Sequence, residues 1–286
     1  MRTEKEMLDL ILNTAKGDER IRAVVMTGSR ANPKVSGDIF ADYDIVYIVN
    51  DVHPFYNNIE FIKPFGELLM LQMPELMHGA SNDGHFVYLM QFADGNRIDL
   101  TFFNLESYLI NASDEPAVIL LDKDKALPPP ETSDKAYHVK PPSENGYFSC
   151  CNNFWWCSMN VAKGIWRTEL PYVMGMYNDV VRKELHLMID WYIGMKNGYE
   201  VSTGKFGRYY KNHLSEKQYD LYNDSFSGAN YEKVWKALFK AGSLFRGVAL
   251  GVGVHFGFPY LHEDDRRVTS FLKHIKTLPS DAKEIF

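Results

Sequence analysis

Two aspartates separated by one residue are the best candidates in this chain for a functional site, because of their residue type and their spacing. Asp42 and Asp44 precede residues 45–49, an almost wholly apolar run that predicts a buried β-strand. Side chains two residues apart on a strand point to the same face, with Cα atoms about 7 Å apart. Two carboxylates there repel each other, and a divalent cation such as Mg²⁺ would remove that cost. The alternative is an exposed, solvated strand face, because Asp-x-Asp occurs often by chance.

A glycine and a serine follow an earlier β-rich run, residues 21–27. Gly28 allows the backbone to approach a phosphate closely, while the hydroxyl of Ser29 and the free amides can donate to phosphate oxygens. The lysine of a P-loop is absent, and the dinucleotide-binding pattern is absent as well. Taken alone, Gly-Ser would be interpreted as a simple turn.

A third acid, Asp99, lies between Ile98 and Leu100 in another β-rich run. Considered alone, it could be a strand-end acid that pairs with Arg97. Together with Asp42 and Asp44 it completes three carboxylates suited to two-metal phosphoryl or nucleotidyl transfer.

The elements that must position these residues are α/β in character up to about residue 123. A capping box at residues 3–6 predicts a helix that Gly17 ends. We expect strands at 21–27, 43–49, 86–92, 97–103 and 117–121, a polar loop at 28–41, and a hairpin turn at 93–96. The carboxylates and the Gly-Ser pair therefore lie at strand ends and within one sheet.

Prolines at 128–130 and 141–142 indicate a linker, because proline removes backbone donors and blocks helices. Beyond it, helical periodicity covers residues 147–167, about 171–196 and 230–254, and a second capping box lies at 215–218. The predicted fold class is α+β, with a mixed α/β part at 1–130 and a nearly all-helical part at 131–286.

The composition is that of an ordinary globular protein, with 286 residues, 45% hydrophobic and 24% charged. A net charge of −6 argues against nucleic acid as a partner and favours a cationic ligand. The charged N-terminus does not resemble a signal peptide, and we find no uncharged apolar run near the roughly 18 residues of a membrane helix. The three cysteines, at 150, 151 and 157, are expected to be reduced and partly buried. We therefore expect a cytoplasmic protein.

The pattern of Gly28-Ser29, a twelve-residue spacer, Asp42-Tyr43-Asp44 and a later strand aspartate resembles the polymerase-beta-like nucleotidyltransferase superfamily. Four short stretches are more specific than this superfamily pattern: Gly-Ser-Arg-Ala-Asn, Asp-Tyr-Asp-Ile, Ile-Asp-Leu-Thr and Leu-Leu-Asp-Lys-Asp. With the Cys-Cys-Asn-Asn-Phe-Trp-Trp stretch that starts at residue 150 and the Val-Ala-Lys-Gly that starts at 161, they resemble the aminoglycoside 6-adenylyltransferases over nearly the whole chain.

This resemblance implies transfer of AMP from Mg-ATP to the 6-hydroxyl of streptomycin, with release of pyrophosphate and resistance to the antibiotic. It also implies a nucleotidyltransferase domain that binds Mg-ATP at 1–130, with a small mixed sheet flanked by helices, and a helical bundle at 131–286 that binds the acceptor. ATP and the drug would meet between the two domains. Asp42 and Asp44 would be metal ligands, and Asp99 a third carboxylate that takes the hydroxyl proton, with or without touching a metal. Ser29, with the loop amides at Gly28, would hold the β- and γ-phosphates.

Five further residues carry weaker hypotheses, each with a structural alternative. Arg30 could contact phosphate or pair with an acid, and Lys163 and Lys205 could contact the triphosphate or be solvated surface lysines. Trp166 could stack on the drug or the adenine or belong to the core. Glu169 could meet a cationic acceptor.

Two other functions stay open. A nucleotide-binding regulator or degenerate homologue would bind without transfer, although retention of all three carboxylates favours an enzyme. An adenylyltransferase could also act on another aminoglycoside or a different hydroxyl. The sequence leaves the oligomeric state and the nucleotide base undecided.

Overall fold

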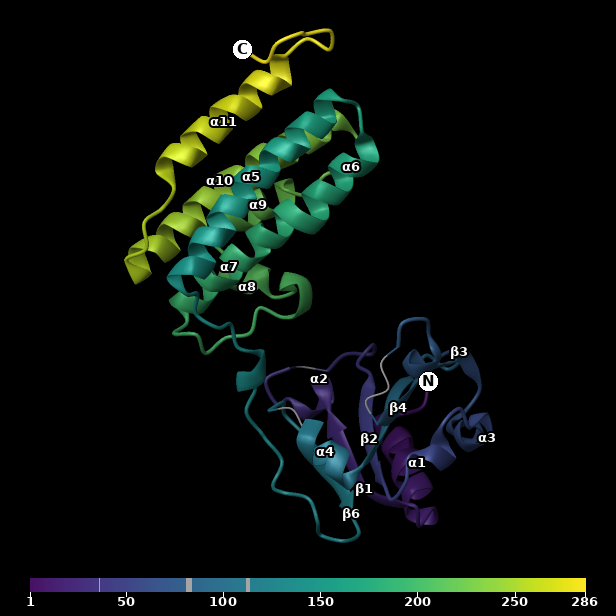
Figure 1. Ribbon diagram of the computed structural model, residues 1–286. Helices are drawn as coiled ribbons and strands as arrows, with labels where there is room; N and C mark the ends of the chain where they lie inside the picture. Colours follow the sequence, from purple (N-terminus) through teal and green to yellow (C-terminus); the bar gives the residue numbers. More distant parts are fainter. Residues whose placement is uncertain (36, 81–83, 112–113) are drawn as a thin grey trace. The chain divides into compact units, whose positions relative to one another are not determined.

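The computed structural model describes residues 1–35, 37–80, 84–111 and 114–286, and it divides into two compact units (Figure 1). Met1–Ala136 forms the first unit and Tyr137–Phe286 the second. The first unit is built on a mixed sheet with helices, and the second is helical. The predicted α+β fold class is therefore confirmed.

Six strands form the sheet of the first unit, in the order β3-β4-β5-β2-β1-β6. Their bounds are β1 Ile21–Thr27, β2 Tyr43–Val49, β3 Leu68–Gln72, β4 His85–Phe92, β5 Arg97–Asn104 and β6 Val118–Asp122. β2 and β5 run parallel, and the other neighbouring pairs run antiparallel. Five of these strands agree with the sequence prediction. The edge strand β3 was not predicted.

Helices of the first unit are mostly short. They are α1 Glu4–Gly17, α2 Gly28–Ala31, α3 Ile59–Ile62 and α4 Leu105–Asn111, with the 3₁₀ turns η1 His53–Phe55, η2 Lys63–Phe65 and η3 Pro74–Leu76. A further 3₁₀ turn, η4 Lys135–Tyr137, includes the last residues of the first unit and the first residue of the second. The predicted capping box of Thr3 and Glu6 begins α1. The prediction of a loop throughout residues 28–41 is wrong at its start, because one helical turn, α2, follows β1 directly.

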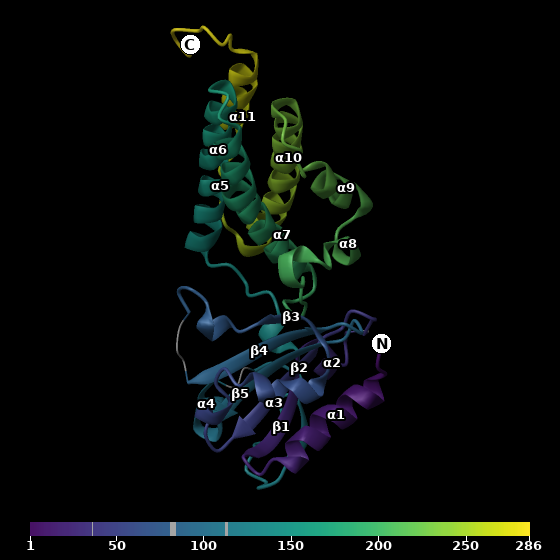
Figure 2. The ribbon, with the colours of Figure 1, turned by 90° about the vertical axis from the view of Figure 1, so that its right-hand side faces the viewer.

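The two faces of the sheet carry separate cores. One face packs alternate residues of β1, β2, β4 and β5 against the apolar side of α1, which contributes Met7, Ile11 and Ala15 (Figure 2). The opposite face has a smaller core around Ala23, Val25 and Ile48, where side chains of α4 pack. This alternation leaves room on the second face, at one end of β2 and β5, for polar side chains.

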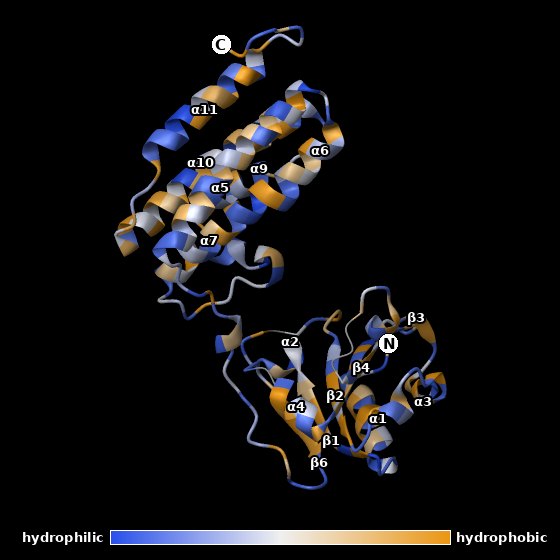
Figure 3. Cartoon of the chain, viewed as in Figure 1, coloured by the Kyte–Doolittle hydropathy of each residue, from blue (hydrophilic) through white to orange (hydrophobic). Residues whose placement is uncertain are grey.

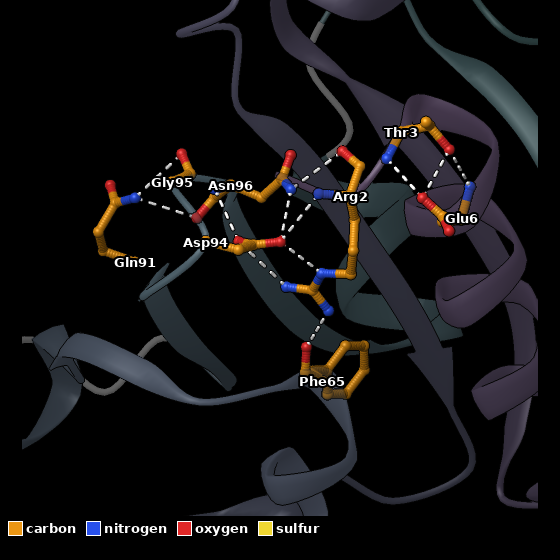
Figure 4. A network of polar contacts seen from close by, with 8 residues as sticks. All are labelled: Arg2, Thr3, Glu6, Phe65, Gln91, Asp94, Gly95 and Asn96. Atoms are coloured by element: carbon orange, nitrogen blue, oxygen red, sulfur yellow. Dashed lines mark hydrogen bonds and ion pairs between the residues drawn. The ribbon is translucent and has the colours of Figure 1, made fainter.

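The start of the chain is tied to the predicted β4–β5 hairpin turn (Figure 4). The guanidinium of Arg2 donates to Asp94 through Nε at 2.7 Å and to the carbonyl of Phe65 at 2.5 Å. Asn96 adds a bond from Nδ2 to the backbone oxygen of Arg2 at 3.2 Å. Arg2 lowers the pKa of Asp94, so the carboxylate of this turn stays ionised.

The second unit is a bundle around the long helices α5 and α10. Its elements are α5 Glu144–Trp166, α6 Leu170–Gly175, η5 Met176–Val181, α7 Arg182–Lys196, η6 Lys205–Gly207, α8 Tyr210–His213, α9 Glu216–Asp224, α10 Tyr231–Phe256 and α11 His262–Thr277. The predicted helix over 171–196 is interrupted by η5, a π-helical segment. The capping box at Ser215 and Gln218 begins α9 as predicted.

The helix α11 escaped prediction because few of its residues are apolar. Figure 3 shows it as mostly hydrophilic, and its buried residues are Asp265, Val268, Leu272 and Ile275. By contrast α10 is long and apolar enough to cross a membrane by length and composition, a feature that we did not expect from the sequence. More than half of its apolar window is buried within the protein, as in the core helix of a helical bundle. All three cysteines are buried and free, as predicted.

Candidate active site

The parallel pairing of β2 with β5 brings two of the predicted carboxylates together. Asp44 and Asp99 are direct register partners across these strands, and Thr27 of β1 is the partner of Asp44 on its other side. Direct partners on neighbouring strands point to the same face of a sheet. Ile98 and Leu100, which flank Asp99, are buried in the opposite core, so the carboxylate of Asp99 points away from that core.

Gly28 lies directly against this pair, and no other residue would fit there. Its φ of +68° is in the left-handed region that favours glycine. A Cβ at this position would lie 2.7 Å from Cγ of Asp44 and would overlap one of its carboxylate oxygens. The Gly-Ser turn thus forms one wall of the carboxylate site, because it allows the backbone to approach Asp44 this closely.

Arg97 joins the outer two carboxylates. Its Nε and Nη2 each donate to one oxygen of Asp99 at 2.7 Å, and its Nε lies 3.5 Å from Asp42 Oδ2. The pairing with Arg97 that the sequence left open for Asp99 is therefore present. The guanidinium supplies one positive charge among the three carboxylates, so the group retains an excess of negative charge.

Asp44 is the acid of the three whose pKa is most perturbed. Removal from water, followed by the charges of Asp99 and Asp42, raises its pKa to about 6. Burial also raises the pKa of Asp42, and Arg97 opposes that rise. The charge of Glu115, a residue that the sequence analysis did not single out, adds to the rise in the pKa of Asp44. A bound cation would favour the ionised forms of these groups.

Arg30 pairs with an acid, one of the two roles considered for it, because its Nη1 lies 3.6 Å from Glu4 Oε1. Its Nε donates to the carbonyl of Asp42 at 3.1 Å and its Nη2 to the carbonyl of Ala41 at 3.0 Å. The guanidinium carbon also lies 3.9 Å from the ring centroid of Tyr43. Arg30 therefore holds the segment that carries Asp42, and it ties the end of the loop to α2.

Comparisons with known proteins identify the family of this chain. The model of the streptomycin adenylyltransferase family matches residues 1–275. This chain belongs to the streptomycin adenylyltransferase family. Proteins named aminoglycoside 6-adenylyltransferase from Bacillus subtilis (strain 168) and Campylobacter jejuni are 36% and 38% identical to it. The matches cover 93% of this chain in both cases, with 95% and 93% of the respective relatives.

A third relative of that name, from Staphylococcus aureus, is 34% identical over 86% of this chain and 89% of its own length. Among solved structures, an aminoglycoside 6-adenyltransferase from Bacillus subtilis is similar at 31% identity, with a TM-score of 0.48. That match covers 97% of this chain and 100% of the solved chain. Membership of the family makes the protein a nucleotidyltransferase, in agreement with the resemblance drawn from its motifs.

The donor set suits a hard cation. Among the described residues, no three His, Cys, Asp or Glu side chains form a ready-made metal cage. Asp42 and Asp44 nevertheless offer carboxylate oxygens in a site with excess negative charge, and Mg²⁺ takes one or two carboxylates with substrate phosphates. The family member therefore has residues that fit a divalent metal bound together with a nucleotide.

The remaining predicted site residues lie in the second unit. Lys163 on α5, Glu169 at the start of α6 and Lys205 in η6 are exposed. Trp166, the last residue of α5, donates its indole N–H to the carbonyl of Pro279 at 3.1 Å. Trp166 thus has a structural contact with the C-terminal segment, which the sequence did not indicate.

Proposed function

We propose that this family member transfers AMP from Mg-ATP to the 6-hydroxyl of streptomycin and releases pyrophosphate. The observation that carries the proposal is the adjacency of Asp44 and Asp99 on parallel strands, with Gly28 packed against them. The names of the three relatives, all aminoglycoside 6-adenylyltransferases, support the acceptor class and the position of the hydroxyl. Such a transfer would inactivate the antibiotic, so the protein would confer resistance.

Asp42 and Asp44 would hold the divalent metal. When bound, Mg²⁺ would supply positive charge for the oxygens of the α-phosphate and of the leaving pyrophosphate. The two carboxylates fix where that charge lies. Since the pKa of Asp44 is raised, metal and nucleotide would bind to its ionised form and displace any proton it carries.

Asp99 would take the proton of the acceptor hydroxyl. An alcohol is a weak nucleophile, and a positioned base contributes about 10²–10⁴-fold to such a transfer. Each oxygen of the Asp99 carboxylate has a second lone pair beyond the one that accepts from Arg97. Arg97 would thus orient the base without blocking it.

Gly28 and Ser29 would approach the β- and γ-phosphates, with Arg30 fixing the loop behind them. Lys163 and Lys205 are proposed as further contacts of the triphosphate, since both ammonium groups are exposed and no ion pair within the described ranges engages them. Glu169 is proposed as a contact of the cationic acceptor.

A pyrophosphate-release assay with ATP, Mg²⁺ and a panel of aminoglycosides tests this function. We expect release that depends on streptomycin and a product one AMP heavier than the drug by mass spectrometry. Asp42→Asn should lose at least about 10³-fold in kcat. Glu67→Gln, the same loss of charge on an exposed residue of the same unit, is the control.

Release with another aminoglycoside only would leave adenylyl transfer standing and change the acceptor. Binding of Mg-ATP with no release for any acceptor would identify a non-catalytic nucleotide-binding homologue. Activity of Asp42→Asn within tenfold of the parent would contradict the assignment of the metal ligands.

A further inference from the structure

The helical unit contains a half-buried carboxylate that the proposed transfer does not use. Asp190 lies on α7, and its Oδ1 is 2.8 Å from the hydroxyl of Tyr210, which is itself fully buried. Burial raises the pKa of Asp190, and the hydroxyls of Tyr210 and Thr203 oppose the rise. Keeping an acid in such a place costs stability unless something compensates its charge.

No positive side chain of the described residues forms an ion pair with Asp190. The nearest candidates on its own helix, Arg182 and His186, are eight and four residues earlier and point along the same face. Arg182 is committed elsewhere: its Nη1 donates to the carbonyl and the hydroxyl of Ser225, both at 2.7 Å. Its guanidinium carbon lies 3.8 Å from the ring centroid of Phe226.

His186 does not supply the missing charge either. Burial, together with Arg182, lowers its pKa to about 4, so the imidazole is neutral near pH 7. Its Nε2 lies 3.4 Å from Nη2 of Arg182 and 3.3 Å from the hydroxyl of Tyr222. The carboxylate of Asp190 is therefore surrounded by neutral hydrogen-bond donors and aromatic rings, and it remains partly open to solvent.

The loop that brings Thr203 to this carboxylate has an unusual backbone. Gly204, Phe206 and Gly207 all have φ between 58° and 74°. A Cβ at Gly204 would lie 2.7 Å from Cδ2 of Tyr209, so packing fixes the conformation. Phe206 is 82% exposed. A non-glycine residue in the left-handed region is costly, and such residues concentrate at ligand-binding segments. The same loop thus positions Thr203 beside Asp190 and presents an aromatic ring to solvent.

We propose that Asp190, with Thr203 and Tyr210, forms a binding site for a guanidinium or ammonium group of the aminoglycoside acceptor. This inference rests on the proposed function and names one subsite of its acceptor. A cation gains a charge-assisted hydrogen bond from a carboxylate and further attraction from aromatic faces. The occupied site would hold a compensating charge that no side chain in the described ranges supplies through an ion pair.

A purely structural role for Asp190 makes a different prediction. An amide at this position keeps an oxygen that can accept from Tyr210 and Thr203, and it removes the charge. If Asp190 only accepts hydrogen bonds, Asp190→Asn should bind cations like the parent. If it is the anchor of the site, the variant should lose the acceptor while the fold becomes no less stable.

Calorimetry with the full chain separates these roles. We expect Asp190→Asn to weaken streptomycin binding at least tenfold and to leave Mg-ATP binding within twofold of the parent. Asp220→Asn, an equal change of charge on an exposed residue of α9, should leave both affinities within twofold. Tyr210→Phe removes one hydrogen bond and keeps the charge, so it should retain streptomycin binding within about fivefold. The melting temperature of Asp190→Asn should equal or exceed that of the parent.

Streptomycin affinity of Asp190→Asn within twofold of the parent would overturn the proposal. A loss of streptomycin affinity in Tyr210→Phe as large as in Asp190→Asn would also overturn it, because hydrogen bonding rather than charge would then determine the affinity. If the parent binds streptomycin through Asp190 and transfers no AMP, the proposed function fails and this site stands. A parent that binds none of the cationic aminoglycosides of the panel refutes both.

Discussion

Replacing Asp44 by asparagine should stabilise the metal-free protein while destroying its activity. A rise in pKa from 3.8 to about 6 means that the folded state holds a proton more readily than the unfolded chain does. The favourable contribution of Asp44 to the free energy of unfolding is therefore present below about pH 4 and is lost as the pH rises to about 6. At pH 7 the ionised carboxylate opposes folding.

The size of the effect follows from that rise. About two pKa units correspond to about 3 kcal/mol, and screening by the solvent that still reaches the site reduces this to about 1–2 kcal/mol. Asparagine has nearly the same shape and no charge, so it fits beside Gly28 without the cost of ionisation. For a unit of this size, we expect the melting temperature at pH 7 to rise by about 4–8 °C.

Differential scanning calorimetry of parent and Asp44→Asn at pH 4 and pH 7, each without metal, tests this reasoning. The difference in melting temperature between the parent and Asp44→Asn should be present at pH 7 and nearly vanish at pH 4. Mg²⁺ with a non-hydrolysable ATP analogue should stabilise the parent more than the variant, because the variant lacks a ligand. Glu67→Gln should match the parent throughout. A metal-free Asp44→Asn that melts at or below the parent at pH 7 would refute the account of Asp44.

Four further changes test other parts of the two units. Asp99→Asn should keep Mg-ATP and streptomycin binding within about tenfold and lower the transfer rate by about 10²–10⁴-fold, with a smaller loss at high pH, measured by single-turnover kinetics; abolished Mg-ATP binding would instead make Asp99 chiefly a metal ligand. Gly28→Ala should lose nucleotide binding, because its methyl group would overlap the Asp44 carboxylate; unchanged binding in calorimetry would show that the turn does not face the nucleotide. Arg97→Met should tighten the binding of Mn²⁺ alone, followed by electron paramagnetic resonance, because a competing cation is removed; weaker binding would mean that the guanidinium chiefly orients the ligands. Phe206→Gly should raise the melting temperature of the helical unit by relieving a left-handed backbone, an effect of about 1 kcal/mol, and a lower melting temperature would show that the ring packs rather than projects.

Much of this protein could be predicted from its sequence because the relevant physics is local. The alternation of apolar residues determined five strands of the sheet, and the capping boxes at Thr3 and Ser215 determined where two helices begin. The Gly-Ser turn, the Asp-x-Asp pair and Asp99 marked the residues of the candidate site, and their spacing indicated the family. Each of these signals lies within a few residues of the chain.

Other features depend on contacts between distant segments. That Asp44 lies directly beside Asp99 follows from the parallel register of β2 and β5, which no short pattern specifies. By sequence Arg30 could contact phosphate or pair with an acid, and Asp99 could pair with Arg97. Only the fold assigns Arg30 to backbone carbonyls and Glu4, and shows that Arg97 holds Asp99. Asp190 also depends on such contacts. Its burial, and the hydrogen bonds that Arg182 donates to Ser225, arise only when α7 packs in the bundle. Local patterns determined which residues are present at each site, and tertiary packing decided their partners and their charge states, because both depend on groups far away in the sequence.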